Sequence, residues 1–150
     1  MNAAARFVTV AMLALCSALS APAALAIDNP DAPDLLGAFQ ARCEKYQAEI
    51  RKQSDTQKMM VAYANYEKFL DAELNKAYDT LLGHVSRDAR DSLVSSQRKW
   101  LQYRDAEFSF IDRNWTLATF GTSSAISRGD YRTDIVKQRV VMLLRYLKNY

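Results

Sequence analysis

Apolar residues recur every three or four positions through most of the chain after residue 33, which is the period of an α-helix with one buried face. This spacing predicts helices over residues 34–53 and 56–82, a third from 86 to about 114, and a last one over 128–148. Glycine and proline are scarce, which disfavours a β-rich fold. The short connections predict antiparallel neighbours. The pattern therefore predicts an all-α fold, a small antiparallel bundle of about four helices with two of them long.

Capping residues stand at the expected helix ends. The first helix can begin at the aspartates of residues 31–34, the second after Ser54 and Asp55, and the third after Ser86. Short polar side chains at these places accept hydrogen bonds from the free N–H groups of a first turn. Gly83 follows the second predicted helix, where a left-handed residue often ends a helix. We therefore expect the second helix to end at residue 82.

Polar residues occupy positions on the apolar stripes where buried side chains are expected. Glu67 interrupts the apolar stripe of the second predicted helix, and Gln97 and Arg104 interrupt that of the third. An isolated buried guanidinium is costly, so Arg104 should pair with Glu67 or Asp71 and fix the register of the two helices. In the alternative interpretation, Arg104 faces a groove and binds a carboxylate of a ligand.

Residues 115–127 have no steady period and are rich in threonine and serine, which predicts a loop with at most one helical turn. Trp115 and Phe120 in this segment either anchor a protein interface or fold back on the bundle as a lid. The hydroxyl residues 122–124 either enter a partner's cleft or form an ordinary polar loop. The candidate partner-binding residues are Trp115, Phe120, Gly121, Thr122, Ser123 and Ser124.

The first 26 residues have the pattern of a signal peptide. Arg6 precedes an apolar run over residues 7–19, and small residues then lead to an expected cleavage site after Ala26. The run is short for a membrane span, and an uncleaved anchor is the alternative. Lipid attachment at Cys16 is disfavoured because a large residue precedes it. We expect one domain, residues 27–150, that is periplasmic or secreted and has no membrane span after cleavage.

Charge and composition exclude several function classes. Without Arg6, 19 lysines and arginines oppose 17 aspartates and glutamates, and a net charge near +2 is too weak to indicate nucleic acid or a membrane surface as the partner. The sequence contains no Ser-His-Asp set, glycine-rich phosphate loop or metal-ligand cluster, so we expect no enzyme, no cofactor and no metal. Cys43 is the one cysteine left after cleavage. It is either a buried small hydrophobe or a thiol that links a homodimer.

Two stretches of the second and third predicted helices form a motif. The first reads Asp-x-Glu-Leu-Asn-x-x-Tyr from residue 71, and the second reads Gln-x-x-Trp-x-x-x-Arg-Asp from residue 97. Together with a Gly-Thr-Ser segment at residue 121 and an arginine in the last helix, this pattern resembles the LprI-like lysozyme-inhibitor family over about residues 56–147. The motif residues, which we expect to be mainly structural, are Asp71, Glu73, Leu74, Asn75, Tyr78, Gln97, Trp100, Arg104, Asp105 and Arg139.

The resemblance implies a non-catalytic inhibitor that binds a lysozyme-like hydrolase of the cell wall in the periplasm. The alternative is an envelope binding or structural module without inhibitory activity. Family members usually carry cysteines that are expected to be bridged, whereas this chain has Phe108 and Tyr131 (or a neighbour) at two of these places and Tyr63 near a third. Two aromatic rings could fill that space by packing. Many lysozymes are basic, so electrostatic steering would require a local acidic patch or an acidic target.

Overall fold

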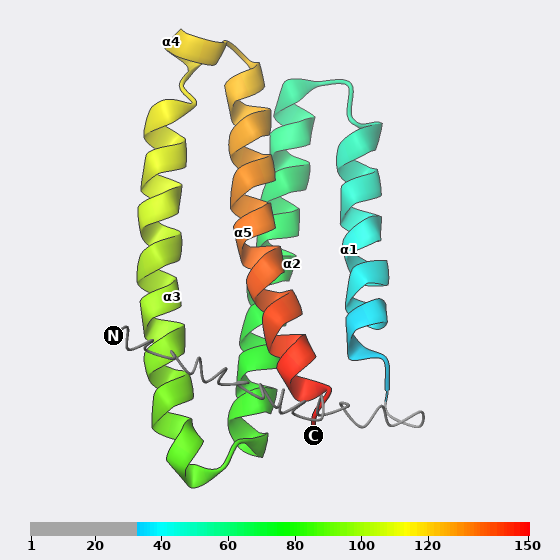
Figure 1. Ribbon diagram of the computed structural model, residues 1–150. Coiled ribbons are helices and arrows are strands. Elements are labelled where there is room, and N and C mark those ends of the chain that lie inside the picture. Colours follow the sequence, from blue (N-terminus) through cyan, green and yellow to red (C-terminus); the bar gives the residue numbers. More distant parts are fainter. Residues whose placement is uncertain (1–32) are drawn as a thin grey trace, which may run out of the picture.

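The computed structural model of the chain describes residues 33–150, so the expected signal peptide, its cleavage site after Ala26 and Cys16 lie outside the described residues. Four long helices lie side by side, and a short helix lies at one end of the bundle (Figure 1). No strand occurs within residues 33–150, and the prediction of an all-α bundle is confirmed. The elements are α1 (Leu35–Lys52), α2 (Thr56–His84), α3 (Arg87–Asn114), α4 (Leu117–Phe120) and α5 (Ser123–Leu147).

Short polar side chains begin α1, α2 and α3, as the sequence predicts. Asp34, Asp55 and Ser86 each accept a hydrogen bond from the backbone N–H three residues later, at 2.8, 2.9 and 3.3 Å. Each bond satisfies one of the N–H groups that a helix leaves without a partner in its first turn. Local chemistry therefore fixes these three boundaries.

The end of α2 differs from the prediction. The helix runs through Gly83 to His84, and the backbone N–H of Val85 donates to the carbonyl of Leu81 at 3.0 Å. Gly83 does not have a positive φ angle, so the prediction that it ends the helix was wrong. Val85 leaves the helix in an extended conformation, and the turn to α3 therefore needs no left-handed residue.

Residues 115–127 are mostly helical, which corrects the prediction of a loop. Thr116 caps the single turn of α4, and α5 begins at Ser123 rather than at residue 128. Gly121, with a φ angle of 60°, reverses the chain between the two helices. Because α5 starts earlier than predicted, it spans 25 residues and extends to the end of the bundle that carries α4 (Figure 1).

The core lies mainly between α2 and α5, which make the most extensive contact in the bundle. Leu70 of α2 and Val140 and Leu143 of α5 have no exposed surface. α1 packs against α2 and contributes Phe39, which is also fully buried. The apolar stripes predicted for these helices therefore form one hydrophobic core.

α3 is attached to the bundle in a different way. Gln97 and Ile111 are its buried residues, and its main neighbour is α5. Leu93, Trp100 and Phe108 are only partly buried against the core. The inner face of α3 is therefore a mixture of aromatic and polar side chains instead of a continuous apolar seam.

Gly129 allows α5 to approach α2 closely. A Cβ atom at this position would lie 2.5 Å from Cγ and 2.7 Å from both Cδ atoms of Tyr63. The hydroxyl of Tyr63 donates to the Asp130 carboxylate at 2.5 Å, and the Thr133 hydroxyl donates to the carbonyl of Gly129 at 2.8 Å. The absence of a side chain at Gly129 thus sets the position of the N-terminal half of α5, which carries the candidate site.

Candidate functional site

The segment with the predicted partner-binding residues forms one end of the bundle, where α3 passes through α4 into α5 (Figure 1). Trp115 ends α3, with its backbone N–H donating to the carbonyl of Ile111 at 3.0 Å. Arg128 of α5 donates from Nη1 to the carbonyl of Trp115 at 3.0 Å. The charged donor satisfies a carbonyl that the end of α3 leaves free and ties the connector to α5.

Five apolar side chains at this end, Trp115 among them, form a group that we call the aromatic tip: Phe110, Trp115, Leu117, Phe120 and Tyr131. The Trp115 ring lies 5.7 Å from Phe110, 6.3 Å from Phe120 and 4.6 Å from Tyr131, measured between ring centroids. Phe110, Leu117, Phe120 and Tyr131 are 56%, 69%, 45% and 46% exposed, whereas Trp115 is half-buried. The structure thus combines the interface and lid interpretations: Trp115 packs against the bundle and supports the other rings, and Phe120 is exposed.

The hydroxyl residues after Gly121 differ in their availability to a partner. Thr122 and Ser123 are exposed, and the Ser123 hydroxyl donates to the carbonyl of Phe120 at 2.6 Å. Ser124 is 2% exposed and donates to the carbonyl of Gly121 at 2.7 Å. Ser124 therefore stabilises the turn, and its proposed place in a partner-binding loop has to be given up. Thr122 provides no side-chain cap, so the first N–H groups of α5 lack that hydrogen bond.

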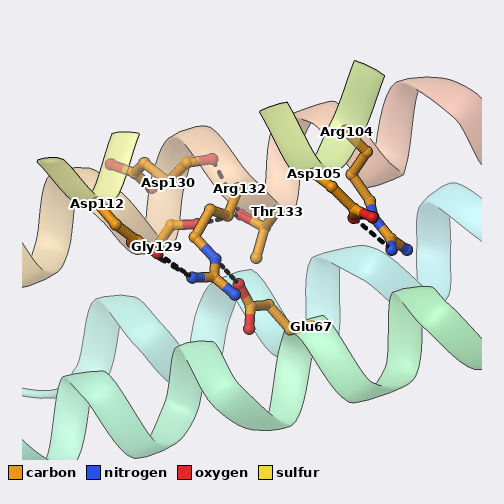
Figure 2. A network of polar contacts seen from close by, with 8 residues as sticks. All are labelled: Glu67, Arg104, Asp105, Asp112, Gly129, Asp130, Arg132 and Thr133. Carbon is orange, nitrogen blue, oxygen red and sulfur yellow. Dashed lines mark hydrogen bonds and ion pairs between the residues drawn. The ribbon is translucent and has the colours of Figure 1, made fainter. Parts of the chain in front are cut away.

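A network of polar contacts lies between α2, α3 and α5 (Figure 2). Arg132 donates from Nε to Glu67 at 2.8 Å, and its Nη1 lies 3.2 Å from Asp112. The predicted pairing of Arg104 with Glu67 or Asp71 was therefore wrong. Arg132, which comes from α5 and not from α3, occupies the carboxylate of Glu67. Arg132 lies at the edge of the apolar face of α5, so the spacing of the apolar residues did not mark it as a buried position.

Arg104 instead binds its neighbour Asp105, at 2.9 and 2.7 Å from Nε and Nη2 (Figure 2). Its guanidinium lies between two aromatic rings of α3, 5.7 Å from the centroid of Trp100 and 5.8 Å from that of Phe108. The side chain is 23% exposed, so most of its surface is covered by these rings and the bundle. These contacts favour a structural role for Arg104 over the alternative in which its guanidinium faces a groove and binds a ligand carboxylate.

Arginines of α5 complete this stack of cations and rings. Arg132 lies 4.3 Å from the centroid of Phe108, and Arg139 lies 5.7 Å from that of Trp100. Arg139 also donates to the Gln97 side chain at 3.1 and 3.0 Å, and desolvation lowers the pKa of its guanidinium. Three guanidinium groups therefore alternate with two rings, and this arrangement explains why α3 adheres to α5 without an apolar seam. The seven-residue spacing between Arg132 and Arg139 was the sequence signal.

Other motif residues serve the fold or remain at the surface. Glu73 accepts from Arg42 of α1 at 2.6 Å, Leu74 is buried in the core, and Tyr78 is half-buried. Asp71 and Asn75 are exposed. The structure therefore brings Gln97, Trp100, Arg104 and Arg139 together, whereas Asp71 and Asn75 form no hydrogen bond or ion pair with them.

The aromatic residues at the places of the family cysteines pack on different partners. Phe108 is covered by the guanidinium of Arg132, and Tyr131 packs on Trp115. Tyr63 packs on Gly129 and binds Asp130. Phe108 and Tyr131 therefore do not pack on each other in place of a disulfide. Phe108 contacts a guanidinium, and Tyr131 contacts a different ring.

Cys43 lies in the core beside Tyr66. Cys43 is 1% exposed and is a free cysteine. The Tyr66 hydroxyl is also buried and has no oxygen or nitrogen partner within the described part of the chain. Burial raises the pKa of the Cys43 thiol and of the Tyr66 hydroxyl. These observations agree with Cys43 as a buried hydrophobe, because a disulfide-linked homodimer would require α1 to open.

Within residues 33–150, no helix is long and apolar enough to cross a membrane, and no group of three or more potential metal ligands gathers. A family model described as Lysozyme inhibitor LprI matches residues 43–143. No curated protein and no solved structure matches the chain. The matched segment includes all of α2, α3 and α4 and therefore the aromatic tip and the arginine stack.

Proposed function

We propose that this chain, which belongs to the LprI lysozyme-inhibitor family, binds a lysozyme-type cell-wall hydrolase outside the cytoplasm and blocks it without chemistry of its own. The family is named for an inhibitor and not for an enzyme. The observation that carries the proposal is the exposed aromatic tip at the α4 end. The N-terminal signal-peptide pattern supports export to the compartment where such hydrolases act.

The aromatic tip has the properties of a protein-binding surface. Exposed aromatic side chains that lie together are costly in water and are typical of the centres of protein interfaces. Trp115 holds Phe110, Phe120 and Tyr131 in contact, so these rings lose little conformational freedom when a partner covers them. The tip therefore offers apolar area at a small entropic cost.

The tip does not need a disulfide for its shape. Arg128 ties the end of α3 to α5, and Gly121 reverses the chain after α4. Gly129 and Tyr63 fix the position of α5 against α2. These contacts supply the rigidity that bridged cysteines are expected to give in other members of the family.

Polar groups beside the tip suit the cleft of a glycosidase. Such a cleft carries two carboxyl groups that flank the scissile bond. Thr122 has an exposed hydroxyl, and the N-terminal turn of α5 next to it has no side-chain cap. Both features offer hydrogen-bond donors to a carboxylate that approaches together with the apolar surface.

The charge near the tip suits a basic partner better than the net charge does. Residues 104–134 hold five carboxylates against four cations, although the chain as a whole is basic. Arg104 and Arg132 neutralise Asp105 and Asp112, and the other three carboxylates form no ion pair within residues 33–150. Local acidity of this kind can orient a basic lysozyme toward the tip.

A wall-lysis assay tests the proposal. The purified mature chain is added to a suspension of bacterial walls with lysozymes of several types, and the fall in turbidity is recorded. We expect the wild type to slow lysis, and we expect the Leu117→Ala/Phe120→Ala variant to require at least about tenfold more protein for the same effect. Met142→Ala/Tyr146→Ala is the matched control, because these residues are 41% and 46% exposed in the last turns of α5, at the end of the bundle opposite α4 (Figure 1). A wild type that binds none of the lysozymes and leaves lysis unchanged would favour the envelope-module alternative.

Export is tested separately from inhibition. N-terminal sequencing of the protein recovered from outside the cytoplasm should begin at Ile27 if cleavage follows Ala26. Recovery of a membrane-bound chain that still begins at Met1 would support the uncleaved anchor. A lipid-modified chain that begins at Cys16 would support the lipoprotein.

A further inference from the structure

A groove of about 450 Å³ lies between α1, α2 and α5, next to the aromatic tip. Its buried lining is mainly apolar and aromatic, from Ile50, Tyr63 and Tyr66 with Thr133, and its exposed lining on α5 includes Asp130 and Asp134. This combination suits a long amphipathic side chain, whose stem packs on the apolar lining while its charged end reaches the carboxylates.

The two aspartates are available to a cation from outside. They lie four residues apart and therefore on the same side of α5. Asp130 accepts the hydroxyl proton of Tyr63 at 2.5 Å, and Asp134 accepts from the amide of Gln138 at 2.6 Å. Both partners are neutral, and no ion pair within residues 33–150 involves either aspartate. The Tyr63 hydroxyl also fixes the orientation of the Asp130 carboxylate.

Two cations border the same groove, and they limit where a positive ligand can bind. Arg51 already forms an ion pair with Glu44 of its own helix. Lys137 lies three residues beyond Asp134, at the side of the groove away from Tyr131. The negative part of the groove is therefore the part nearest the tip.

The groove continues into the tip through Tyr131. This residue lines the groove, and its ring lies 4.6 Å from that of Trp115. A partner seated on the aromatic tip would thus extend over the mouth of the groove. We infer that the groove receives a lysine or arginine side chain of the hydrolase bound at the tip, with Asp130 and Asp134 as its carboxylate contacts. This inference rests on the proposed function and identifies the partner as a hydrolase with a basic residue beside its cleft.

The affinity of the mature chain for a basic c-type lysozyme, measured by titration calorimetry at low and at physiological salt, tests the inference. Asp130→Asn/Asp134→Asn removes both charges and keeps the shape and the hydrogen-bond acceptors. We expect its Kd to rise about tenfold at low salt, from two exposed ion pairs, and we expect the difference to shrink as salt is added. Lys137→Gln should lower Kd about twofold, because it removes a like charge from the groove.

Asp79→Asn/Asp91→Asn is the matched control, because both residues are exposed near the opposite end of the bundle and the change in net charge is the same. If the control weakens binding as much as the groove variant does, general charge and not the groove is responsible, and the inference is overturned. It is also overturned if the groove variant binds like the wild type while Leu117→Ala/Phe120→Ala has lost affinity. That result would leave the proposed function intact. If the wild type itself binds no lysozyme, the proposed function fails first and the inference fails with it.

Discussion

Two glycines in helices should respond in opposite directions to the same substitution. Gly83 and Gly129 both lie inside long helices, where alanine is favoured over glycine by about 1 kcal/mol. A Cβ atom at Gly83 would meet nothing within 4 Å, whereas a Cβ atom at Gly129 would meet the Tyr63 ring at 2.5 Å. The difference between the two variants therefore isolates the close contact of α5 with α2.

The magnitudes follow from these surroundings. Gly83→Ala should raise the free energy of unfolding by about 0.5–1 kcal/mol, because the gain in helix propensity meets no steric cost. Gly129→Ala should lower it by about 1.5–5 kcal/mol. Forcing a methyl group into a packed site costs about 1–3 kcal/mol, and displacement of Tyr63 would also break the hydrogen bond to Asp130, worth about 1.5–3 kcal/mol with a charged acceptor. The gain in propensity offsets about 1 kcal/mol of this loss.

Urea unfolding followed by far-UV circular dichroism measures both effects on the mature chain. We expect midpoints on either side of the wild type, with a gap in the free energy of unfolding of at least about 2 kcal/mol. A Gly129→Ala variant as stable as the wild type would refute the close packing of α5 on Tyr63. A destabilised Gly83→Ala variant would show that Gly83 has the left-handed conformation that the sequence pattern suggested.

Three further changes test the core and the arginine stack. Tyr66→Phe should raise the free energy of unfolding by about 1 kcal/mol, because its buried hydroxyl has no oxygen or nitrogen partner and faces only the weakly hydrogen-bonding thiol of Cys43; a loss of stability in thermal unfolding would show that this contact matters. Burial raises the pKa of Cys43, Tyr63 and Tyr66 from ordinary values of 9.0, 10.0 and 10.0, so the folded state holds their protons more tightly. The contribution of these groups to the free energy of unfolding is fully present below about pH 9 and should decrease as the pH rises through 9 and 10, because the unfolded chain then loses these protons first. The decrease should be smaller in Tyr66→Phe. Equal urea midpoints at pH 7.5 and 10.5 would contradict this. Arg132→Lys should lose about 1 kcal/mol, because lysine lacks the fork that spans Glu67 and Asp112; a midpoint equal to that of the wild type would mean that a point charge suffices.

Most of the fold could be predicted from the sequence because α1, α2 and α3 are long and carry their own boundary signals. Asp34, Asp55 and Ser86 act on N–H groups only three residues away, so their role can be inferred without the rest of the molecule. The error at Gly83 has a different source. Glycine permits a left-handed helix end but does not require it, and the extended conformation of Val85 turned the chain instead.

The segment after Trp115 could not be predicted because its structure depends on distant residues. A single turn such as α4 is too short to show a period. The early start of α5 relies on the turn at Gly121 and on the packing of Gly129 against Tyr63, which is 66 residues away in the sequence. Local composition, rich in threonine and serine, therefore indicated a loop where tertiary packing produces a helix.

The candidate site was predicted in part. Trp115 and Phe120 were identified because aromatic residues in an irregular segment are unusual, but Phe110 and Tyr131 lie on helices where their exposure could not be foreseen. The partner of Arg104 was missed for a similar reason. The sequence shows that a guanidinium needs a carboxylate, but only the arrangement of three helices shows that Arg132 reaches Glu67.

Hydrogen exchange of the complex with lysozyme tests the central claim most directly, since it reports which surface meets the hydrolase. Backbone amides of residues 115–123, in and around the single turn of α4, should exchange quickly in the free protein and slow down by at least about tenfold when lysozyme is saturating. Amides around the α2–α3 turn, at the opposite end of the bundle, should be unaffected (Figure 1). Protection at the α2–α3 turn, with none in residues 115–123, would contradict the assignment of the aromatic tip as the inhibitory surface.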